Sequence, residues 1–418
     1  MKNNKQIHIS TAGLIIISFI LFVVLFLFSP VLSDQDEFCG TYISKNNYMG
    51  FMVNCDSTTY LEPAEKLSII FEKNSVRQSR PIYISMGAIF GSLIKILVKF
   101  HDMNPYYLAF IMINLILIII SINLYANILS SINIKNHLIY ISSIYLICND
   151  IVRFYFWGAT PQLFGILTPI ATICIGMKII EDQIISKKNL SLYSLSCGFL
   201  PLLYGNFIIV GFVILMSYYY NLVLARRISV RAVLENGVMA LVLFILPTLA
   251  WVTCLTLVSG GYFNAEIQIF REIVWILDAL DSGDLGARFL ENTNMYFRTF
   301  LNVDILPFFL MSFLVSLYLV VNFKEFKEYS LDKKHIYFLI MSVIAFLFLF
   351  FWILGYYAPR FTFTMVPPLV IYITISFDFI IKRFKCFNSV IFVSVFSIIT
   401  VLWCCCHMFN SIPYIGPY

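Results

Sequence analysis

Long apolar runs recur along the whole chain and limit it to one kind of fold. A helix of about 20 apolar residues crosses the roughly 30 Å hydrocarbon core of a bilayer, and short polar segments separate runs of about this length throughout the 418 residues. Hydrophobic residues make up 60% of the chain and charged residues only 12%. Soluble domains do not have this composition. The sequence therefore predicts an all-α polytopic membrane protein, with 1-418 as a single membrane domain.

Eleven of these runs are candidate membrane spans, and one further apolar segment, 82-99, is ambiguous. In this segment Lys95 and Lys99 lie four residues apart on one helical face, and Pro81 with Gly87 weakens its start. Counting it as a crossing would invert the side of every later loop. The candidate spans are 11-32, 106-127, 137-149, 163-180, 190-204, 206-224, 236-258, 305-323, 336-354, 361-381 and 389-406.

The distribution of basic residues resolves this ambiguity. If 82-99 lies along the membrane surface, nearly all lysines and arginines of the short loops fall on one side, and the short loops of the other side keep only Arg153 and Arg360. Basic loops face the cytoplasm in membrane proteins. We therefore expect eleven spans, an interfacial or re-entrant helix at 82-99, a cytoplasmic N-terminus and a C-terminus outside. Two large extracytoplasmic loops, 33-105 and 259-304, then share the outer face.

Several classes of function lack their sequence signatures. The chain has no GxxxxGK[ST] phosphate loop, which argues against ATP-driven transport. Cys39 and Cys55 share the first outer loop and either form a disulfide or stay free. Asp278, Asp281 and Asp284 offer oxygen ligands for a divalent cation, but their spacing is not that of an EF-hand. We expect no metal and no cofactor.

An acidic cluster, Asp34, Asp36 and Glu37, follows the first apolar run directly. Carboxylates at the edge of low-dielectric lipid lose hydration, so a substrate, a cation or a mechanism has to retain them there. Asp36 and Glu37 are joined to the end of a rigid helix by only a few residues, which would hold a carboxylate in place near the membrane surface. Such a carboxylate is a candidate general base. The alternative is a solvated, acidic start of the loop.

Three arginines near the outer ends of spans are candidates for binding phosphate. Arg80 directly precedes Pro81, where the interfacial helix would begin. Arg153 lies in an outer turn, and Arg360 stands at the start of span 361-381. A guanidinium at headgroup depth binds phosphate through paired hydrogen bonds. Anchoring to lipid headgroups explains Arg80 and Arg360 as well.

The side chain of Arg153 also has a plainer explanation, an ion pair with Asp150 one helical turn earlier. The second outer loop, 259-304, has helical periodicity over 267-280 and then a DSGDLG turn. Such a pattern is typical of a folded, amphipathic lid. Its candidates for contact with an acceptor are Arg288, Arg298 and Asp281.

The order of these pieces resembles the GT-C integral-membrane glycosyltransferases that use polyprenyl-phosphate sugars. The matching pieces are Asp36-Glu37, Arg80-Pro81-Ile82-Tyr83, Asn104-Pro105, the polar turn 153-162, and Arg360 before Val366-Pro367-Pro368-Leu369. The resemblance covers nearly the whole chain in order. Departures occur where the family has an arginine, an acid and a lysine, and this chain has Thr160, Gln162, and Tyr204 or Gly205.

The resemblance implies a GT-C-like bundle and an inverting transfer of a hexose, with glucose expected, from undecaprenyl phosphate. The compact length is most like the phage-type O-antigen glucosyltransferases of Gram-negative bacteria, which modify lipopolysaccharide and convert serotype. Asp36 would be the acceptor base, with Glu37 and Asp34 as supporting acids. Arg80, Arg153 and Arg360 would bind the donor phosphate.

The partners implied are a polyprenyl-phosphate-linked sugar donor, a polysaccharide or lipid-linked acceptor, and membrane lipids, with no nucleic acid. The expected place is the bacterial inner membrane, with the active face in the periplasm. Three alternatives remain open. They are a flippase or transporter of lipid-linked saccharides, an O-antigen polymerase or ligase, and a non-catalytic structural membrane protein.

Overall fold

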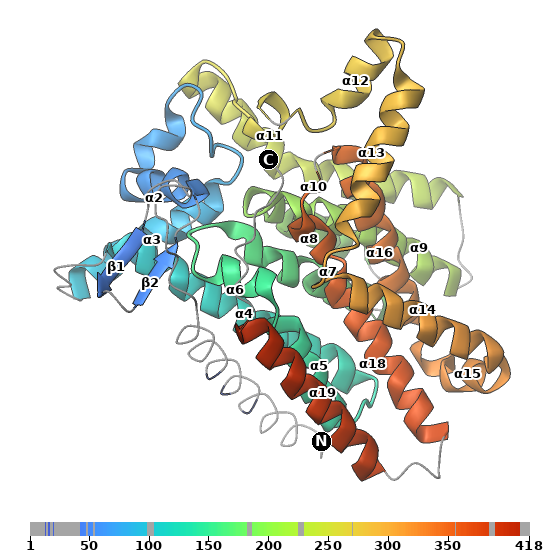
Figure 1. The fold of residues 1–418 in the computed structure, drawn as a ribbon. Helices are drawn as coiled ribbons and strands as arrows, with labels where there is room; N and C mark the ends of the chain where they lie inside the picture. The colour runs from blue at the N-terminus through green and yellow to red at the C-terminus, as the bar shows by residue number, and fades with distance from the viewer. Residues whose placement is uncertain are drawn as a thin grey trace.

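The computed structural model is a bundle of long helices with shorter helices gathered at one end (Figure 1). It describes residues 13, 16, 20, 42–46, 49–52, 55–97, 104–181, 186–224, 230–269, 271–355, 357–383 and 389–409. The strands are β1 (Tyr42–Asn46) and β2 (Met49–Met52). The helices are α2 (Thr58–Glu65), α3 (Pro81–Leu97), α4 (Pro105–Ser131), α5 (Asn136–Ile147), α6 (Asp150–Phe156), α7 (Phe164–Glu181), α8 (Lys187–Cys197), α9 (Ile209–Leu224), α10 (Val230–Ser259), α11 (Ala265–Gln268), α12 (Val274–Asp281), α13 (Leu285–Thr299), α14 (Leu306–Val321), α15 (Phe323–Tyr329), α16 (Lys334–Leu354), α17 (Pro359–Phe363), α18 (Val366–Arg383) and α19 (Ser389–Phe409).

Six helical segments of the described chain are long and apolar enough to cross a membrane. A seventh results if α14 and α15, which meet at a bend of 102°, are counted together. The six segments are Pro105–Ser131, Pro161–Glu181, Gly205–Leu222, Leu234–Ser259, Leu331–Leu354 and Pro359–Arg383. The prediction of a polytopic α-helical membrane protein is confirmed.

The number of eleven spans stays a prediction. The apolar runs expected at 137-149 and 190-204 form α5 and α8, which have only 12 and 11 residues. Of the first expected span, 11-32, the structure describes three residues. The last expected span, 389-406, forms α19, with 21 residues.

A small β-hairpin in the first large loop is the one correction to an all-α fold within the described chain. β1 pairs antiparallel with β2, and Tyr42 lies opposite Met52. The register shifts between Ser44 and Asn46. Backbone hydrogen bonds between two short strands are local and need little apolar patterning, so the hydropathy of the sequence did not indicate them.

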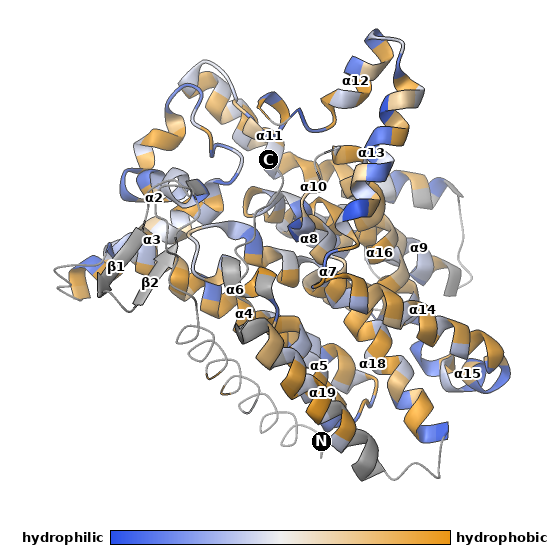
Figure 2. Ribbon diagram, viewed as in Figure 1, coloured by the Kyte–Doolittle hydropathy of each residue, from blue (hydrophilic) through white to orange (hydrophobic). Residues whose placement is uncertain are grey.

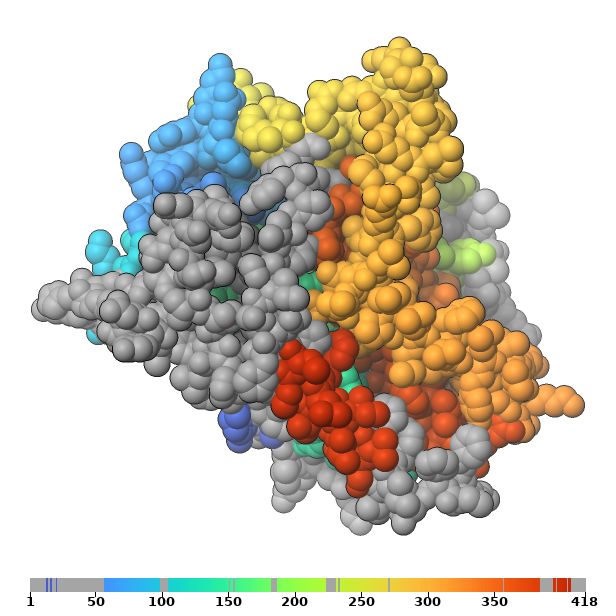
Figure 3. Space-filling model, in the orientation of Figure 1, coloured from blue at the N-terminus to red at the C-terminus, as the bar shows by residue number. Residues whose placement is uncertain are grey.

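Helices α7 and α18 form the centre of the bundle. Their spanning segments are 78% and 83% buried, whereas that of α10 is only 22% buried. Apolar residues cover the long helices, and hydrophilic residues collect in the segments around α12, α13 and α15 (Figure 2). In the space-filling view, α12 and α13 rise above the bundle on one side (Figure 3).

Helix α3 packs tightly on α4 through two glycines. A Cβ atom at Gly87 would lie 2.2 Å from Cζ of Phe110, and one at Gly91 would lie 2.3 Å from Cδ1 of Tyr106. Small residues four apart allow such close helix contacts in membranes. The last two residues of α3 are 77% and 78% exposed and apolar, as expected where a helix meets lipid. The interfacial position of 82-99 stays a prediction.

Candidate functional site

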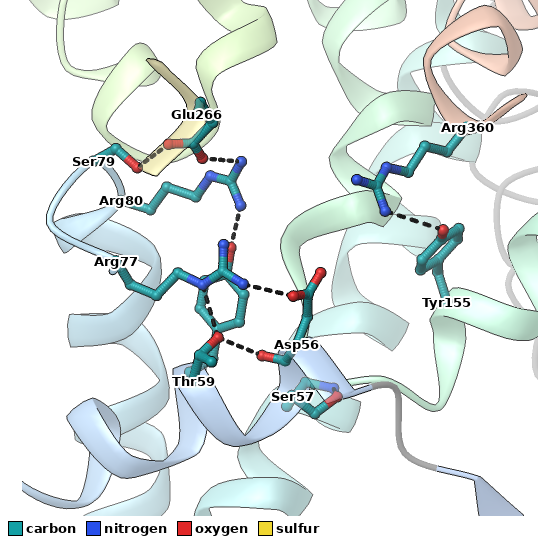
Figure 4. A network of polar contacts seen from close by, with 11 residues as sticks. Asp56, Ser57, Thr59, Arg77, Ser79, Arg80, Tyr155, Glu266 and Arg360 are labelled. Carbon is teal, nitrogen blue, oxygen red and sulfur yellow. Dashed lines mark hydrogen bonds and ion pairs between the residues drawn. The ribbon is translucent and has the colours of Figure 1, made fainter. Parts of the chain in front are cut away.

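Five charged residues form a polar network at the end of the bundle where α7 and α18 begin and α10 and α16 end. Two lie in the turn before α3, one in α11, one between α11 and α12, and one in α17. We call them the arginine site: Arg77, Arg80, Glu266, Glu272 and Arg360. Figure 4 shows four of them, with Arg80 and Arg360 on opposite sides of the network.

Arg80 is held by residues from distant parts of the chain. Its Nη2 donates to Oε1 of Glu266 at 2.9 Å, and its Nη1 donates to the hydroxyl of Tyr60. Its Cζ lies 5.7 Å from the ring centroid of Tyr204. The side chains of Arg80 and Glu266 are 14% and 18% exposed, so the ion pair is largely withdrawn from water. Removing either charge would leave the other one poorly solvated.

Arg77 binds α2 to the turn before α3. Its Nη2 donates to Oδ1 of Asp56 at 2.8 Å, and its Nε donates to Oγ1 of Thr59 at 2.7 Å. The guanidinium also lies over the ring of Tyr60, 4.4 Å from the centroid. These partners come from one short helix and the residues before it. We therefore assign Arg77 a structural role, which positions Arg80 three residues later.

Arg360 enters the site from the opposite side. Pro359 occupies the first turn of α17, where its fixed φ angle suits a helix start. Nη1 of Arg360 donates to the hydroxyl of Tyr155 in α6 at 3.4 Å (Figure 4). The hydroxyls of Thr362 and Thr299, 2.5 Å apart, fasten α17 to α13. The guanidinium of Arg360 thus points into the protein, toward α6.

Glu272 is buried in the second large loop, on a backbone that is unusual on both sides. Glu272 is only 8% exposed. The flanking residues Arg271 and Ile273 have φ angles of 56° and 68°. A β-branched residue such as Ile273 rarely adopts this left-handed region, and such strain persists where tertiary contacts enforce it. The N–H of Glu272 donates to the carbonyl of Glu266 at 3.1 Å, and that of Ile273 donates to the carbonyl of Leu354 at 2.9 Å.

The carboxyl group of Glu272 lies within electrostatic range of two arginines of the site, Arg80 and Arg360. Burial raises the pKa of Glu272 to about 7, nearby Glu266 raises it too, and Arg80 and Arg360 lower it. Within the described chain, no residue donates a hydrogen bond to this carboxyl group. No sequence pattern singles out Glu272, because it is one of several acids in a loop of mixed charge.

The end of α16 fixes the loop that carries Glu272. The indole Nε1 of Trp275 donates to the carbonyl of Ile353 at 2.9 Å. Gly355 has a φ angle of 74°, and a Cβ atom there would lie 2.1 Å from Cδ1 of Trp275. Glycine is therefore required at 355 both by backbone conformation and by space. Arg360 follows five residues later, so this contact also holds Glu272 near Arg360.

The turn that follows α6 is held to α4 by hydrogen bonds. Nδ2 of the buried Asn114 donates to the carbonyls of Phe156 and Gly158, both at 2.9 Å. The hydroxyl of Tyr107 donates to the carbonyl of Trp157 at 2.7 Å. Asn114 thus satisfies backbone carbonyls that a turn inside the bundle would otherwise leave without a donor.

The hydroxyl of Tyr204 donates to Oε1 of Gln162 at 3.2 Å. Tyr204 is 3% exposed and lies within electrostatic range of both Arg80 and Arg360. Tyr204 and Gln162 thus form a neutral hydrogen-bonded pair beside the arginine site.

Several predicted site residues are not part of this network. Arg288 and Arg298 lie on α13 and Asp281 ends α12, and all three are exposed. Arg288 pairs with Glu291 on the same helix at 3.0 Å. Their assignment to an acceptor-binding lid stays a prediction. The lid itself is broken into α11, α12 and α13 rather than one helix over 267-280.

Other predictions fall outside what the structure describes. The acids Asp34, Asp36 and Glu37 lie outside the described residues, as does Cys39. The backbone of Arg153 belongs to α6, but its side chain is not among those described. In the described part of the chain, no three His, Cys, Asp or Glu side chains gather as a metal ion would require.

No family model, no curated protein and no solved structure matched the chain. The function is therefore inferred from the side chains of the site. Two arginines that converge beside buried acids, at one end of a membrane-spanning bundle, suit an anionic group at the membrane surface.

Proposed function

We propose that the protein is a GT-C-type glycosyltransferase that moves a hexose, glucose, from undecaprenyl phosphate to O-antigen or a related polysaccharide. The observation that supports this most is the approach of Arg80 and Arg360 to one end of the bundle from segments far apart in sequence. The phosphate of a lipid-linked donor lies at headgroup depth, and its polyprenyl tail runs along apolar helices. Two guanidinium groups at that depth suit such a phosphate.

In the proposed reaction, an acceptor hydroxyl attacks the anomeric carbon from the face opposite the phosphate. The bond between that carbon and the phosphate oxygen breaks, and the configuration inverts. Asp36 takes the proton of the hydroxyl, and Glu37 and Asp34 support it. Arg80, Arg360 and Arg153 neutralise the charge that grows on the leaving phosphate.

The proposed topology has eleven spans, a cytoplasmic N-terminus and a periplasmic active face in the bacterial inner membrane. The loops 33-105 and 259-304 then lie outside. Support comes from the opposite end of the bundle, where α15 turns by 102° away from α14. Basic residues collect at that end, as expected for the cytoplasmic side. They are Lys324, Lys327, Lys333, Lys334, Lys382 and Arg383.

The chain departs from the resembled pattern at Thr160, Gln162, and Tyr204 or Gly205. Gln162 accepts from the hydroxyl of Tyr204 at 3.2 Å, and Tyr204 lies within electrostatic range of Arg80 and Arg360. The proposal therefore assigns the donor phosphate to the arginines and not to these positions.

A transporter is less well supported, because it needs polar groups along a path through the middle of the membrane. Asn114 is a polar residue within a long apolar helix. Its amide nitrogen donates to the carbonyls of Phe156 and Gly158. It thus stabilises a turn of the protein rather than lining a path.

The mass of the outer polysaccharide repeat, with and without this gene, tests the proposal. A difference of one hexose per repeat is expected for the transferase. Loss of chain length would indicate a polymerase instead, and an unchanged polysaccharide would contradict both enzymes.

The same measurement tests the acceptor base. Asp36→Asn should lower transfer by about 10² to 10⁴, the usual contribution of a general base. Asp332→Asn, in the turn before α16 at the other end of the bundle, should transfer normally. Near-normal transfer by Asp36→Asn would refute the assignment.

A further inference from the structure

Glu272 has no part in the proposed reaction, yet it is the most deeply buried acid of the arginine site. Among the side chains that the structure describes, Arg80 and Arg360 face Glu266 and Glu272, and Arg77 is paired with Asp56. A phosphodiester anion would add one negative charge next to these largely buried acids. Buried charge without compensation is costly, and a neighbouring group commonly takes up a proton instead.

We propose that Glu272 is the proton-binding group of the site, which takes up one proton from water as a phosphodiester anion reaches Arg80 and Arg360. When the anion leaves, the proton returns to water. The inference rests on the proposed function for the nature of the anion, which is the phosphodiester of a lipid-linked sugar.

Glu266 is a poorer candidate for this proton. Its Oε1 accepts from Arg80 at 2.9 Å, and its Oε2 accepts from the hydroxyl of Ser79 at 3.4 Å. Both contacts stabilise the ionised form. The carboxyl group of Glu272 receives no such donor from any residue that the structure describes.

The backbone shows that this position of Glu272 is enforced. Residues on both sides of it have left-handed φ angles, and Ile273 is held by the carbonyl of Leu354. Trp275, packed on Gly355, fixes the same loop. A strained loop that carries an acid into a buried cationic site is typical of functional positions.

The direction of the pH effect follows from the charges that surround Glu272. Arg80 and Arg360 lower its pKa in the free site, and an anion bound to them removes part of that effect. The pKa of Glu272 should therefore be higher in the complex than its free value of about 7. Affinity is then greatest below about pH 7 and falls above it, by at most about tenfold per pH unit.

The other charged and titratable groups in or beside the arginine site do not account for such an effect. Arg80, before α3, and Arg360, in α17, remain charged at every pH used. Glu266, in α11, is paired with Arg80 at 2.9 Å. Burial raises the pKa of Tyr262 to about 12, Glu266 raises it too and Arg80 lowers it, so this side chain stays neutral.

The test uses the full chain in nanodiscs and farnesyl-phosphoryl-glucose, a phosphodiester with no group of its own that titrates near neutral pH. Calorimetry at pH 7, in two buffers of different ionisation enthalpy, counts the protons taken up on binding. We expect about half a proton for the wild type. We also expect a dissociation constant that rises between pH 6 and pH 8, by up to about tenfold.

Glu272→Gln should bind without proton uptake, with the same affinity at pH 6 and pH 8. Its affinity should match that of the wild type at pH 6, because glutamine resembles the protonated acid. Glu235→Gln, an exposed acid on α10 paired with Arg231, is the matched control and should keep the wild-type profile. Uptake that is unchanged in Glu272→Gln would overturn the inference.

The remaining outcomes separate this inference from the proposed function. Binding with proton uptake but without hexose transfer would uphold the role of Glu272 and overturn the transferase. Hexose transfer with phosphodiester binding that takes up no proton would uphold the transferase and overturn the role of Glu272. Should Glu272→Gln not fold, the proton count of the wild type still decides, since zero uptake contradicts the inference. A wild type that binds no phosphodiester at any pH also overturns it.

Discussion

Two polar clusters lie at opposite ends of the bundle, and they are built differently. At one end, the fully buried Asp378 accepts through Oδ2 from the hydroxyl of Tyr329 at 2.7 Å and from Nζ of Lys382 at 2.6 Å. Lys382 is one turn further along the same helix. At the other end, Arg80 pairs with Glu266 across 186 residues of sequence.

The two carboxyl groups differ in the hydrogen-bond donors that they have among the described residues. The carboxylate of Asp378 has an aromatic hydroxyl and a lysine as donors, and these come from two neighbouring helices, α15 and α18. Glu272, in contrast, is buried within electrostatic range of Arg80 and Arg360, and the residues on both sides of it have positive φ angles. Among the described residues, none donates a hydrogen bond to its carboxyl group. Local rules of stability are usually broken at functional sites and compensated elsewhere.

The largest expected difference between the two ends of the bundle is the effect of a substitution on the rate of hexose transfer. Arg80→Gln should lower hexose transfer by about 10² to 10³, the usual cost of removing one charge-stabilising donor. Lys382→Gln, at the Asp378 end, should leave transfer unchanged. Polysaccharide mass and transfer rate in membranes measure both variants.

A double variant separates chemistry from folding in this prediction. Arg80→Gln alone leaves Glu266 without its ion-pair partner, whereas Arg80→Gln with Glu266→Gln leaves neither charge. The double variant should regain thermal stability but not transfer. Recovery of transfer in the double variant would contradict a role of Arg80 in binding phosphate.

The second prediction concerns the stability of the ligand-free protein as a function of pH. The pKa of Glu272 is raised from 4.5 to about 7 in the folded protein. Between these two pH values, the folded protein therefore keeps a proton on Glu272 that the unfolded protein has lost. The stabilisation is complete below about pH 4.5 and is lost as the pH rises through about 7. The loss should be on the order of 3 kcal/mol.

The melting temperature of the wild type, followed by tryptophan fluorescence, should therefore fall between pH 5 and pH 7.5 relative to Glu272→Gln. Asp378→Asn should keep the wild-type dependence. Parallel curves for the wild type and Glu272→Gln would show that another group titrates.

The third prediction weakens the loop that carries Glu272. Gly355→Ala forces a Cβ atom against Trp275 at a φ angle of 74°, and should cost about 1 to 3 kcal/mol in unfolding free energy. It should also weaken the binding of the phosphodiester. Gly286→Ala is the matched control, because nothing lies within 4 Å of a Cβ atom there. Equal effects of the two variants would contradict the anchoring role of Gly355.

The smallest expected effect is at the Asp378 end. Asp378→Asn keeps an oxygen that accepts from Tyr329, and the side chain of Lys382 is 45% exposed and can turn to solvent. Unfolding free energy should fall by about 1 kcal/mol, and transfer should not change. A loss of transfer without a loss of stability would mean that the Asp378 end also has a functional role.

The long helices could be predicted from the sequence, since apolar runs and helix-start prolines define them. Pro105 and Pro359 both stand at helix starts, and Asn104 caps α4 by accepting from two backbone N–H groups. Arg80 and Arg360 could be singled out because each lies next to a proline at the end of an apolar run. Hydropathy and helix-start signals are local, and they survive without tertiary contacts.

Glu272 and Asp378 could not be found in this way. A sequence in which Arg271 precedes Glu272 indicates a solvated loop, and only the left-handed backbone turns the acid inward. Asp378, four residues before Lys382, looks like a surface ion pair at the end of a span. Burial in both cases is decided by neighbouring segments that are distant in sequence.

The packing of Trp275 on Gly355 divides the second large loop, 259-304, into two parts. Residues 272–275 move with the end of α16, and therefore with Arg360, whereas the turn that contains Gly283 and Gly286 has open space around both glycines. Insertions or deletions at that turn would change the surface of α12 and α13 without moving Glu272. If the proposed function holds, new acceptors can be accommodated by altering α12 and α13 while Glu272 and Arg360 keep their places.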